Sequence, residues 1–506
     1  MAALDASALY NYNDSLNRQQ HSMGQKTHQL SSKTAFILCL AICVFLFYCT
    51  IRVQSHISFD PDEGVDLVVF RTVQAGSPLY QSTYFSQPPG FFLTIYPGYL
   101  LFGSTLEAAR LAMCLWSLVG LLAVVWFACE LKSPTFGFMA IGVLYMIPVY
   151  FDQTVTFQAD ALPAVFSMLA LAAIMRFRNT SSRIWMILSA LAAGMSFLTK
   201  GDVSVLPAVG LVMIWAVIER KEPFLRLVSH AGLFALAYVA MVVLMCLPFG
   251  LTAVYQNVVT LRTLAGVAFP HDTGVFLSTL AQKPQLWKIG VLAILSSGLA
   301  FFANHDARPP VLILLAWTLS TLIILFFYHP LWQHHLTLLA LPVALLFSLS
   351  VYKIFAPRLE GLVRAATLVF VVVVLIGRFN YTLSVRQGIM SDIDWHGVNL
   401  VKANTQPGDY VVSDQGFIPV LADRPTPPNL TDLSPVRIIS GGLSQQAFEA
   451  ALDQYKPKMI LLWEEWLVSM PNVDEIVKRH HYALMEAPDS QHRAYLLESQ
   501  AANPGY

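Results

Sequence analysis

Charged side chains are scarce in this sequence. Only 12% of its 506 residues are Asp, Glu, Lys or Arg, while 56% are hydrophobic. A soluble globular protein carries about 25% charged residues, so roughly half of the charge that would cover a water-exposed surface is missing. The 31 basic residues are balanced by 31 acidic ones, so no excess positive charge indicates a nucleic-acid partner. The composition therefore argues against a soluble multidomain protein.

Cysteine is also rare, and nucleotide-binding motifs are missing. The six cysteines all lie in apolar runs: Cys39, Cys43, Cys49, Cys114, Cys129 and Cys246. They form neither a disulfide framework nor a zinc-type spacing, so we interpret them as small buried apolar residues. The polar C-terminal tail has no Gly-x-Gly-x-x-Gly or Walker-type loop, so nucleotide binding is not indicated.

The charge that remains is unevenly distributed. Residues 381–506 hold 24 of the 62 charged residues and a net charge of −6, whereas the first 380 residues carry +6. A membrane-crossing helix needs about 20 mostly apolar residues. Eleven such runs occur, at 34–53, 107–130, 135–151, 160–176, 184–199, 203–218, 227–250, 286–303, 309–327, 336–352 and 361–380. We predict a polytopic α-helical membrane protein with a cytoplasmic N-terminus at 1–33, a transmembrane body at 34–380 and a soluble extracytoplasmic domain at 381–506.

The basic residues favour one orientation in the membrane. An apolar stretch at 88–103 is short and interrupted by prolines, and its placement decides the sidedness of everything after it. If it stays at the outer interface, 14 of the 22 basic residues of the body are cytoplasmic, and if it crosses, only 9 are. Because cytoplasmic loops are enriched in Lys and Arg, the first arrangement is favoured. The first outer loop, 55–105, and the tail then face outward from the plasma membrane.

The tail alternates between strand-like and helix-like segments. Strands are expected at 408–414, 458–463 and 493–498, and helices near 444–455 and 473–480. Such alternation predicts a small α/β domain. A role in acceptor binding or as a lid and a purely structural role both stay open.

Three carboxylates lie within four residues directly after the first apolar run: Asp60, Asp62 and Glu63. Carboxylates beside a membrane need partners, water or a cation. They could form a solvated loop, whereas a calcium loop is poorly supported because the twelve-residue ligand pattern is missing. The functional interpretation is a general base that takes a proton from an acceptor hydroxyl. Residues 65–75 are expected to form a short interfacial helix that ends at Gly76.

Two more polar residues lie at the ends of predicted spans. Asp160 opens one span, where it could cap the helix or serve in an outer cavity, and the two roles are compatible. Lys200 lies in Thr199-Lys200-Gly201 between two spans. It could extend to the interface, pair with Asp202 or meet a lipid phosphate as a point charge.

Aromatic and histidine-rich segments are found at the predicted outer side. Tyr80 and Tyr84 lie in the proline-rich first outer loop, where single tyrosines are typical of interfacial anchors. Three histidines, at 329, 334 and 335, lie within seven residues ahead of a late span. No Cys or Glu-x-x-His partner accompanies them, so we favour hydrogen bonds to a phosphate over metal binding. We predict no cofactor, with a divalent cation as the alternative.

Taken in order, these motifs resemble the membrane glycosyltransferases with the GT-C fold. The similar family is that of the protein O-mannosyltransferases and the lipid A aminoarabinose transferases. The resemblance covers nearly the whole chain and implies about 11 transmembrane helices, interfacial helices and an outer α/β domain. The matching features are Pro61-Asp62-Glu63, Pro88-Pro89, Asp160, Thr199-Lys200-Gly201 and residues 385–506.

The resemblance also implies roles for single residues. Asp62 matches the family's catalytic base and Glu63 its acidic neighbour. Asp160 matches an acid that orients the acceptor or the base, and Lys200 matches a lysine near the donor phosphate. Asp60 is an additional carboxylate that could exchange roles with Asp62.

The remaining implied contacts are with substrate. His334 and His335 fall where later outer-loop residues of the family meet the lipid carrier. Tyr80, Tyr84 and Gln87 are expected to bind substrate from the first outer loop. Gln87 stands where relatives often place a lysine before Pro-Pro, which weakens a phosphate-binding role for this segment.

The implied reaction is inverting transfer of a sugar from a polyprenyl-phosphate donor to a hydroxyl of a protein, lipid or glycan acceptor at the outer face. Its partners are that donor, membrane lipid and the acceptor. A polymerase or ligase that joins lipid-linked glycans is the nearest rival. A secondary transporter would need internal repeats and ionisable residues near the bilayer midplane, whereas here these residues lie at span ends.

Overall fold

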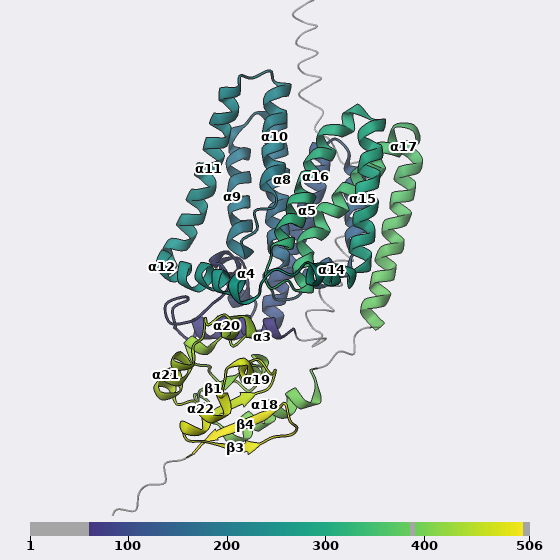
Figure 1. Cartoon of the computed structure of the whole chain (residues 1–506). Coiled ribbons are helices and arrows are strands. Elements are labelled where there is room, and N and C mark those ends of the chain that lie inside the picture. The colour runs from purple at the N-terminus through teal and green to yellow at the C-terminus, as the bar shows by residue number, and fades with distance from the viewer. Residues whose placement is uncertain (1–59, 385–389, 499–506) are drawn as a thin grey trace, which may run out of the picture. The chain divides into compact units, whose positions relative to one another are not determined.

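The computed structural model describes residues 60–384 and 390–498 (Figure 1). The predicted N-terminus at 1–33 and the first predicted span, 34–53, lie outside the described residues. The long helices of the body are α5 (Leu106–Glu130), α8 (Ala161–Thr180), α9 (Arg183–Lys200), α11 (Phe224–Cys246), α15 (Pro284–Ala303), α16 (Arg308–Phe326) and α17 (Thr337–Ser384). The shorter ones are α3 (Pro61–Gln74), α4 (Pro89–Leu101), α6 (Pro134–Tyr145), α7 (Pro148–Gln153), α10 (Leu206–Glu219), α12 (Leu251–Val254), α13 (Leu261–Ala268) and α14 (Thr273–Ala281).

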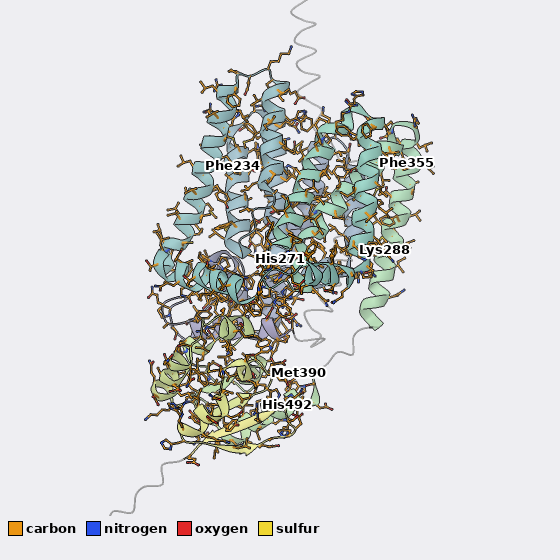
Figure 2. All side chains as sticks on the ribbon, viewed as in Figure 1. Phe234, His271, Lys288, Phe355, Met390 and His492 are labelled. Atoms are coloured by element: carbon orange, nitrogen blue, oxygen red, sulfur yellow. The ribbon has the colours of Figure 1, made fainter. Side chains whose placement is uncertain are left out.

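The body is that of a multi-span membrane protein. In the described ranges, six helical segments are long and apolar enough to cross a membrane: Leu106–Glu130, Ala161–Thr180, Phe224–Phe249, Pro284–Ala303, His305–Phe326 and Gln333–Arg378. Large apolar side chains are exposed along them, for example Phe355, which is 49% exposed (Figure 2). Such exposure is costly in water and ordinary in lipid. The number of eleven spans and the sidedness of the termini stay predictions.

Several predicted spans differ in detail from the observed helices. The apolar run at 135–151 is divided into α6 and α7, with Pro148 opening the second helix. The runs at 336–352 and 361–380 both lie in α17, which bends at Leu359 shortly after Pro357. The ambiguous stretch at 88–103 forms α4, whose 13 residues reach about 20 Å, short of a hydrocarbon core of about 30 Å.

The C-terminal segment forms the predicted α/β domain. Its mixed sheet has the order β1 (Val411–Ser413), β2 (Met459–Leu462), β4 (Arg493–Leu497), β3 (Tyr482–Glu486). Strands β1 and β2 are parallel, with Val412 opposite Ile460, and the other pairs are antiparallel. The predicted strands near β1, β2 and β4 are confirmed, whereas β3 was not expected, because its alternation of apolar and polar residues is weak.

Strands β1, β2 and β4 of the sheet are covered on both faces. Val412, Ile460 and Tyr495 face one core with α21 (Gln445–Tyr455) and α22 (Val473–Arg479). The alternate residues face a second core with α18 (Asp392–Asn404) and α19 (Phe417–Leu421). The remaining helix is α20 (Pro435–Ile439).

The domain is packed tightly against helix α3 of the body. A Cβ at Gly416 would lie 2.5 Å from the carbonyl carbon of Gly64, and a Cβ at Gly64 would lie 2.9 Å from the backbone nitrogen of Phe417. Only glycine permits so close an approach of two backbones. This contact fixes the turn after β1 against the helix that carries the predicted catalytic base.

Candidate active site

Helix α3 begins four residues earlier than the sequence suggested, because Asp60 caps it. The Asp60 carboxylate accepts a hydrogen bond from the backbone N–H of Asp62 at 3.1 Å, and the Glu63 side chain accepts from Asp60 N at 3.4 Å. With Pro61 at the first helical position, this is a reciprocal capping box. Asp62 and Asp66 are four residues apart on this helix and therefore lie on the same face.

Glu63 is fully buried and engaged on both oxygens. Arg110 of α5 donates to it twice, from Nε at 2.8 Å and from a terminal nitrogen at 2.5 Å. The backbone N–H of Phe157 donates to the same carboxylate at 2.7 Å. Both partners are buried, so the fork of the guanidinium fixes α3 against α5 and against the segment that leads to Asp160. The structure thus places Glu63 behind the site as a clamp.

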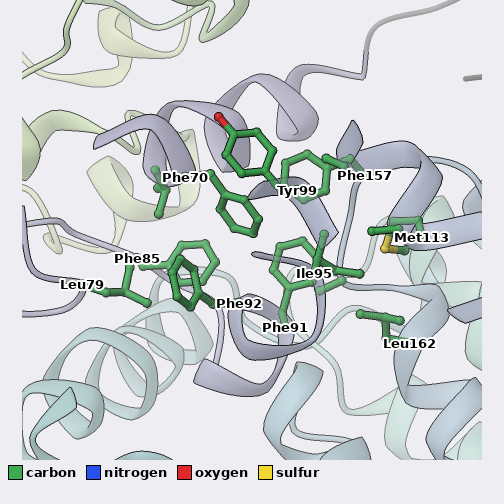
Figure 3. Close-up of a cluster of buried hydrophobic side chains, with 14 of the residues drawn as sticks. Phe70, Leu79, Phe85, Phe91, Phe92, Ile95, Tyr99, Met113, Phe157 and Leu162 are labelled. Carbon is green, nitrogen blue, oxygen red and sulfur yellow. The ribbon is translucent and has the colours of Figure 1, made fainter. Parts of the chain in front are cut away.

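Aromatic packing supports α3 on the side that faces α4 (Figure 3). The ring of Phe70 lies 4.9 Å from that of Phe157 and 5.4 Å from that of Tyr99, both edge to face. Phe91 and Phe92 of α4 complete this buried cluster. Edge-to-face pairs are directional, so the cluster holds the helix in one orientation.

Asp160 and Lys200 form a buried ion pair. Lys200 Nζ lies 2.5 Å from Asp160 Oδ2, and the two residues are 9% and 2% exposed. The helix-cap interpretation of Asp160 is wrong, because its side chain makes no cap hydrogen bond to α8. Pairing of Lys200 with Asp202 is also wrong, since Asp202 accepts hydrogen bonds from Ser167, Ser196 and Ser204 instead.

The position of Lys200 follows from its helix end. Gly201 closes α9 in the left-handed region, with φ +76°, and the chain turns away after the lysine. One turn earlier, the backbone of Leu198 meets Gly90 of α4, where a Cβ would lie 2.6 Å away. The end of α9 is therefore held directly beside the first outer loop.

His334 and His335 lie in a single helical turn, Gln333–Leu336, ahead of α17, whereas His329 lies before this turn. Nδ1 of the buried His335 accepts a hydrogen bond from the backbone N–H of Trp332 at 3.1 Å. A neutral imidazole has one proton, so this bond puts the proton on Nε2 and makes that nitrogen a donor.

Asp160, His334 and His335 offer ligand atoms within 4.8 Å of one another, a spacing that could hold a cation. Two observations argue against that use. The Lys200 ammonium is bonded to Asp160, and the Trp332 hydrogen bond leaves His335 Nε2 protonated, so it cannot act as a metal ligand.

These elements enclose a cleft of about 110 Å³. Five of the predicted site residues line it, together with residues from α13 and the C-terminal domain. The polar lining residues are Asp62, Asp66, Ser86, Gln87, Lys200, Arg262, His334, His335, Asp432 and Ser434.

The other predicted residues lie around the cleft. Asp60 caps α3, Glu63 is clamped by Arg110, and Asp160 bonds Lys200. Tyr80 is buried against Phe249, 5.6 Å between ring centres, and donates to the Gln87 carbonyl at 2.6 Å.

Tyr84 is held by the C-terminal domain. Its backbone N–H donates to Pro428 O at 3.0 Å, and the Arg437 guanidinium lies 3.4 Å from its ring centre. Neither Tyr80 nor Tyr84 is among the described residues that line the cleft.

Three charged residues of the cleft were not predicted as site residues: Asp66, Arg262 and Asp432. Arg262 of α13 lies 3.5 Å from Gln87 Oε1 and 3.1 Å from the Tyr328 hydroxyl. It supplies a positive charge beside Gln87, the position where the resemblance implied a lysine. Asp66 could have been found from its spacing to Asp62, whereas Arg262 and Asp432 carry no local signal in the sequence.

The carboxylates of the cleft differ in acidity. Burial raises the pKa of Asp62 from 3.8 to about 7, with a further rise from Asp60 that Lys200 opposes. Burial also raises the pKa of Asp60 to about 6 and that of Asp66 well above its usual range. Burial alone would raise the pKa of Asp160, but the charge and hydrogen bond of Lys200, together with the charges of His334 and Arg262, outweigh burial and lower the pKa. A carboxylate with a raised pKa, such as Asp62, can take up a proton as a base, whereas one with a lowered pKa, such as Asp160, stays ionised.

Comparisons with known proteins agree with the resemblance predicted from the sequence. Residues 86–247 match the family described as dolichyl-phosphate-mannose-protein mannosyltransferase. A search of curated protein sequences finds no match. The crystal structure of ArnT from Cupriavidus metallidurans bound to undecaprenyl phosphate is similar, with a TM-score of 0.59, 14% identity and coverage of 94% of this chain and 100% of that one. The apo state of ArnT gives a TM-score of 0.60 at the same identity and coverage.

The family resemblance is therefore confirmed. The sequence match covers about a third of the chain, from Ser86, shortly before α4, to Leu247, directly after α11. The structural match extends over nearly all of it, and at this identity it establishes the fold. The chain is a multi-span membrane protein with the GT-C fold.

Proposed function

We propose that the protein is an inverting glycosyltransferase that moves a sugar from a polyprenyl-phosphate donor to an acceptor hydroxyl. The observation that carries this proposal is the composition of one cleft, in which a carboxylate of raised pKa, Asp62, lies with Lys200 and Arg262. The family match supports sugar transfer, and the similar protein ArnT was crystallised with undecaprenyl phosphate.

Asp62 is the group best suited to act as general base. It is half-buried and lines the cleft from the first turn of α3. A base works best when its pKa lies near the working pH, which a value of about 7 satisfies. Glu63 and Asp160 are committed to Arg110 and Lys200, so they support the site as positioning groups.

The donor phosphate has matching partners in the same cleft. Lys200 and Arg262 supply positive charge, and Nε2 of His335 supplies a neutral N–H. A departing phosphate carries negative charge, which such fixed donors stabilise better than water does. Asp160 orients Lys200 toward this task through the 2.5 Å ion pair.

The step is a single displacement. The acceptor hydroxyl oxygen forms a bond to the anomeric carbon as Asp62 takes the hydroxyl proton. The bond between that carbon and the phosphate oxygen breaks, and its electron pair leaves with the polyprenyl phosphate. Attack from the face opposite the leaving group inverts the anomeric centre, as in inverting glycoside hydrolysis.

The proposed setting is the outer face of the plasma membrane. A topology of eleven spans with the C-terminal domain outside places most Lys and Arg residues of the body on the cytoplasmic side, as is typical of membrane proteins. A donor with a polyprenyl tail also explains why a sugar-transfer site is built at the end of membrane helices. A C-terminal tag that is accessible only from the cytoplasm would contradict this orientation.

Mass spectrometry of glycans and glycolipids from cells with and without the protein tests the proposal. We expect one sugar residue to disappear from one class of glycoconjugate when the protein is removed and to return with the intact chain. A ladder of repeating units that shortens would instead identify the rival function, a polymerase or ligase of lipid-linked glycans. Unchanged glycans, glycolipids and glycoproteins would contradict both.

A further inference from the structure

The C-terminal domain supplies one wall of the cleft, and we propose that its Asp432 selects the acceptor by accepting hydrogen bonds from neighbouring hydroxyls of a carbohydrate. This inference rests on the proposed sugar transfer and names the chemistry of its acceptor. Asp432, Ser434 and Val436 line the cleft together with Asp62.

The loop that carries Asp432 is fixed to the first outer loop of the body. The hydroxyl of Thr431 donates to the Tyr84 carbonyl at 2.7 Å, and Tyr84 N donates to Pro428 O at 3.0 Å. The Arg437 guanidinium stacks on the Tyr84 ring at 3.4 Å, close enough for a cation–π interaction. The wall is therefore part of the same rigid arrangement as the first outer loop.

Arg437 also fixes the shape of the loop itself. It is 4% exposed and donates to the backbone carbonyls of Asp432 at 2.6 Å and Asn429 at 2.9 Å. The Asp432 carboxylate accepts one hydrogen bond from Ser434 N at 2.9 Å. A carboxylate has about four acceptor positions, so most of its capacity remains for a ligand.

The acidic and the basic residues of the cleft come from different elements. Helix α3 and the C-terminal domain contribute the carboxylates Asp62, Asp66 and Asp432. The helix ends of the body contribute the cations Lys200 and Arg262. An anionic donor phosphate matches the cations, whereas the carboxylates call for a ligand that presents hydrogen-bond donors.

The acceptor must reach Asp62, because that residue takes its proton. Asp432 lines the same cleft as Asp62 and Asp66, which places it near the attacking hydroxyl. A carbohydrate presents a second and third hydroxyl beside the reacting one, and a carboxylate can accept from two of them at once. A serine or threonine side chain has a single hydroxyl and would leave Asp432 without a partner.

The test uses the full-length protein in lipid nanodiscs and compares Asp432→Ala and Asp432→Asn with the matched control Asp392→Asn. Asp392 is exposed on α18 of the same domain. Asn can still accept from Ser434 N, so the Asn variant keeps the loop turn. One assay measures binding of undecaprenyl phosphate. The other measures transfer from a radiolabelled polyprenyl-phosphate sugar pool to increasing amounts of glycolipid extracted from host membranes.

We expect Asp432→Ala to raise the glycolipid concentration for half-maximal rate about tenfold, as loss of a charged hydrogen bond would. Undecaprenyl phosphate binding should change less than about twofold, since such a loss falls on the acceptor alone. An unchanged glycolipid dependence in Asp432→Ala, or label attached directly to serine or threonine side chains of protein, would overturn this inference alone. A wild-type protein that neither binds undecaprenyl phosphate nor transfers label would overturn the proposed function and this inference with it.

Discussion

Lys200 Nζ lies 2.5 Å from Asp160 Oδ2, and both side chains are almost completely buried. The second oxygen of Asp160 is buried and has no hydrogen-bond partner in the part of the chain that the structure describes. Among the described residues, the Lys200 ammonium is therefore the hydrogen-bond partner that compensates the buried charge of Asp160. This pair links the residue that directly precedes α8 to the cation that we assign to the donor phosphate.

Asp160→Ala should weaken donor binding more than acceptor binding. Removing one partner of a buried ion pair leaves an uncompensated charge, at a cost of about 3–5 kcal/mol, and frees Lys200 to move. We expect undecaprenyl phosphate affinity to fall at least tenfold, measured by titration in nanodiscs. Asp453→Asn, an exposed carboxylate of the C-terminal domain, provides the control and should bind normally. Unchanged affinity in Asp160→Ala would show that the pair does not position Lys200 for the phosphate.

Glu63→Ala should act chiefly on stability. The variant leaves the Arg110 guanidinium buried without its carboxylate, which costs about 3–5 kcal/mol. Thermal unfolding in detergent should show a clearly lower Tm than the wild type. Because removing both charges avoids a lone buried ion, the double variant Glu63→Leu/Arg110→Met should recover part of the loss. If Glu63→Ala unfolds at the wild-type temperature, the clamp is not needed to hold α3.

The pH dependence of kcat/KM should report the base. Asp62 has a pKa of about 7, raised from 3.8 mainly by burial. The active form is the ionised one, so kcat/KM should rise as pH increases through about 7 and then level off. In Asp62→Glu, any residual activity should show a shifted limb. A profile that is flat between pH 5 and 8 for the wild type would contradict the assignment of this carboxylate.

The raised pKa of Asp62 also makes stability depend on pH. Whereas kcat/KM should rise with pH, the stability of the folded state should fall. The folded state holds the Asp62 proton more tightly than the unfolded state, so this group lowers stability as pH rises from about 4 to about 7. Asp62→Asn carries no such charge. We expect its Tm to equal or exceed that of the wild type at pH 8, measured in the same detergent, and a lower Tm would contradict the raised pKa.

Metal chelation should leave transfer intact. The Lys200 ammonium is bonded to Asp160, and the hydrogen bond at Nδ1 leaves Nε2 of His335 protonated. We therefore expect unchanged rates after treatment with EDTA, with metal content followed by elemental analysis. Loss of activity that Zn²⁺ or Mn²⁺ restores would show that Asp160, His334 and His335 hold a cation after all.

Local patterns were enough to find the elements that carry the site. The order of Asp62, Lys200 and His335 along the chain, each at a predicted outer span end, placed them on one side, and the structure brings all three to one cleft. The Asp60-Pro61 pair with Glu63 three residues later was an available N-terminal signal for α3, and the sequence prediction still began the helix at residue 65.

Long-range partners could not be predicted in the same way. Arg110 lies in an apolar run 47 residues after Glu63, and nothing in that run indicates which carboxylate it meets. Asp432 and Arg262 reach the cleft only because the C-terminal domain and α13 pack against the first outer loop. Such contacts are set by tertiary packing and not by the period of any one segment.

The rate of sugar transfer by the Asp62→Asn variant is the measurement that tests most directly whether Asp62 is the general base. The variant keeps the shape of the side chain and removes its basicity, and a general base contributes about 10²–10⁴ in rate. With a radiolabelled polyprenyl-phosphate sugar and saturating acceptor in nanodiscs, we predict a loss of at least about a hundredfold. Binding of undecaprenyl phosphate and Tm should stay as in the wild type or improve. Full transfer by this variant would contradict the account.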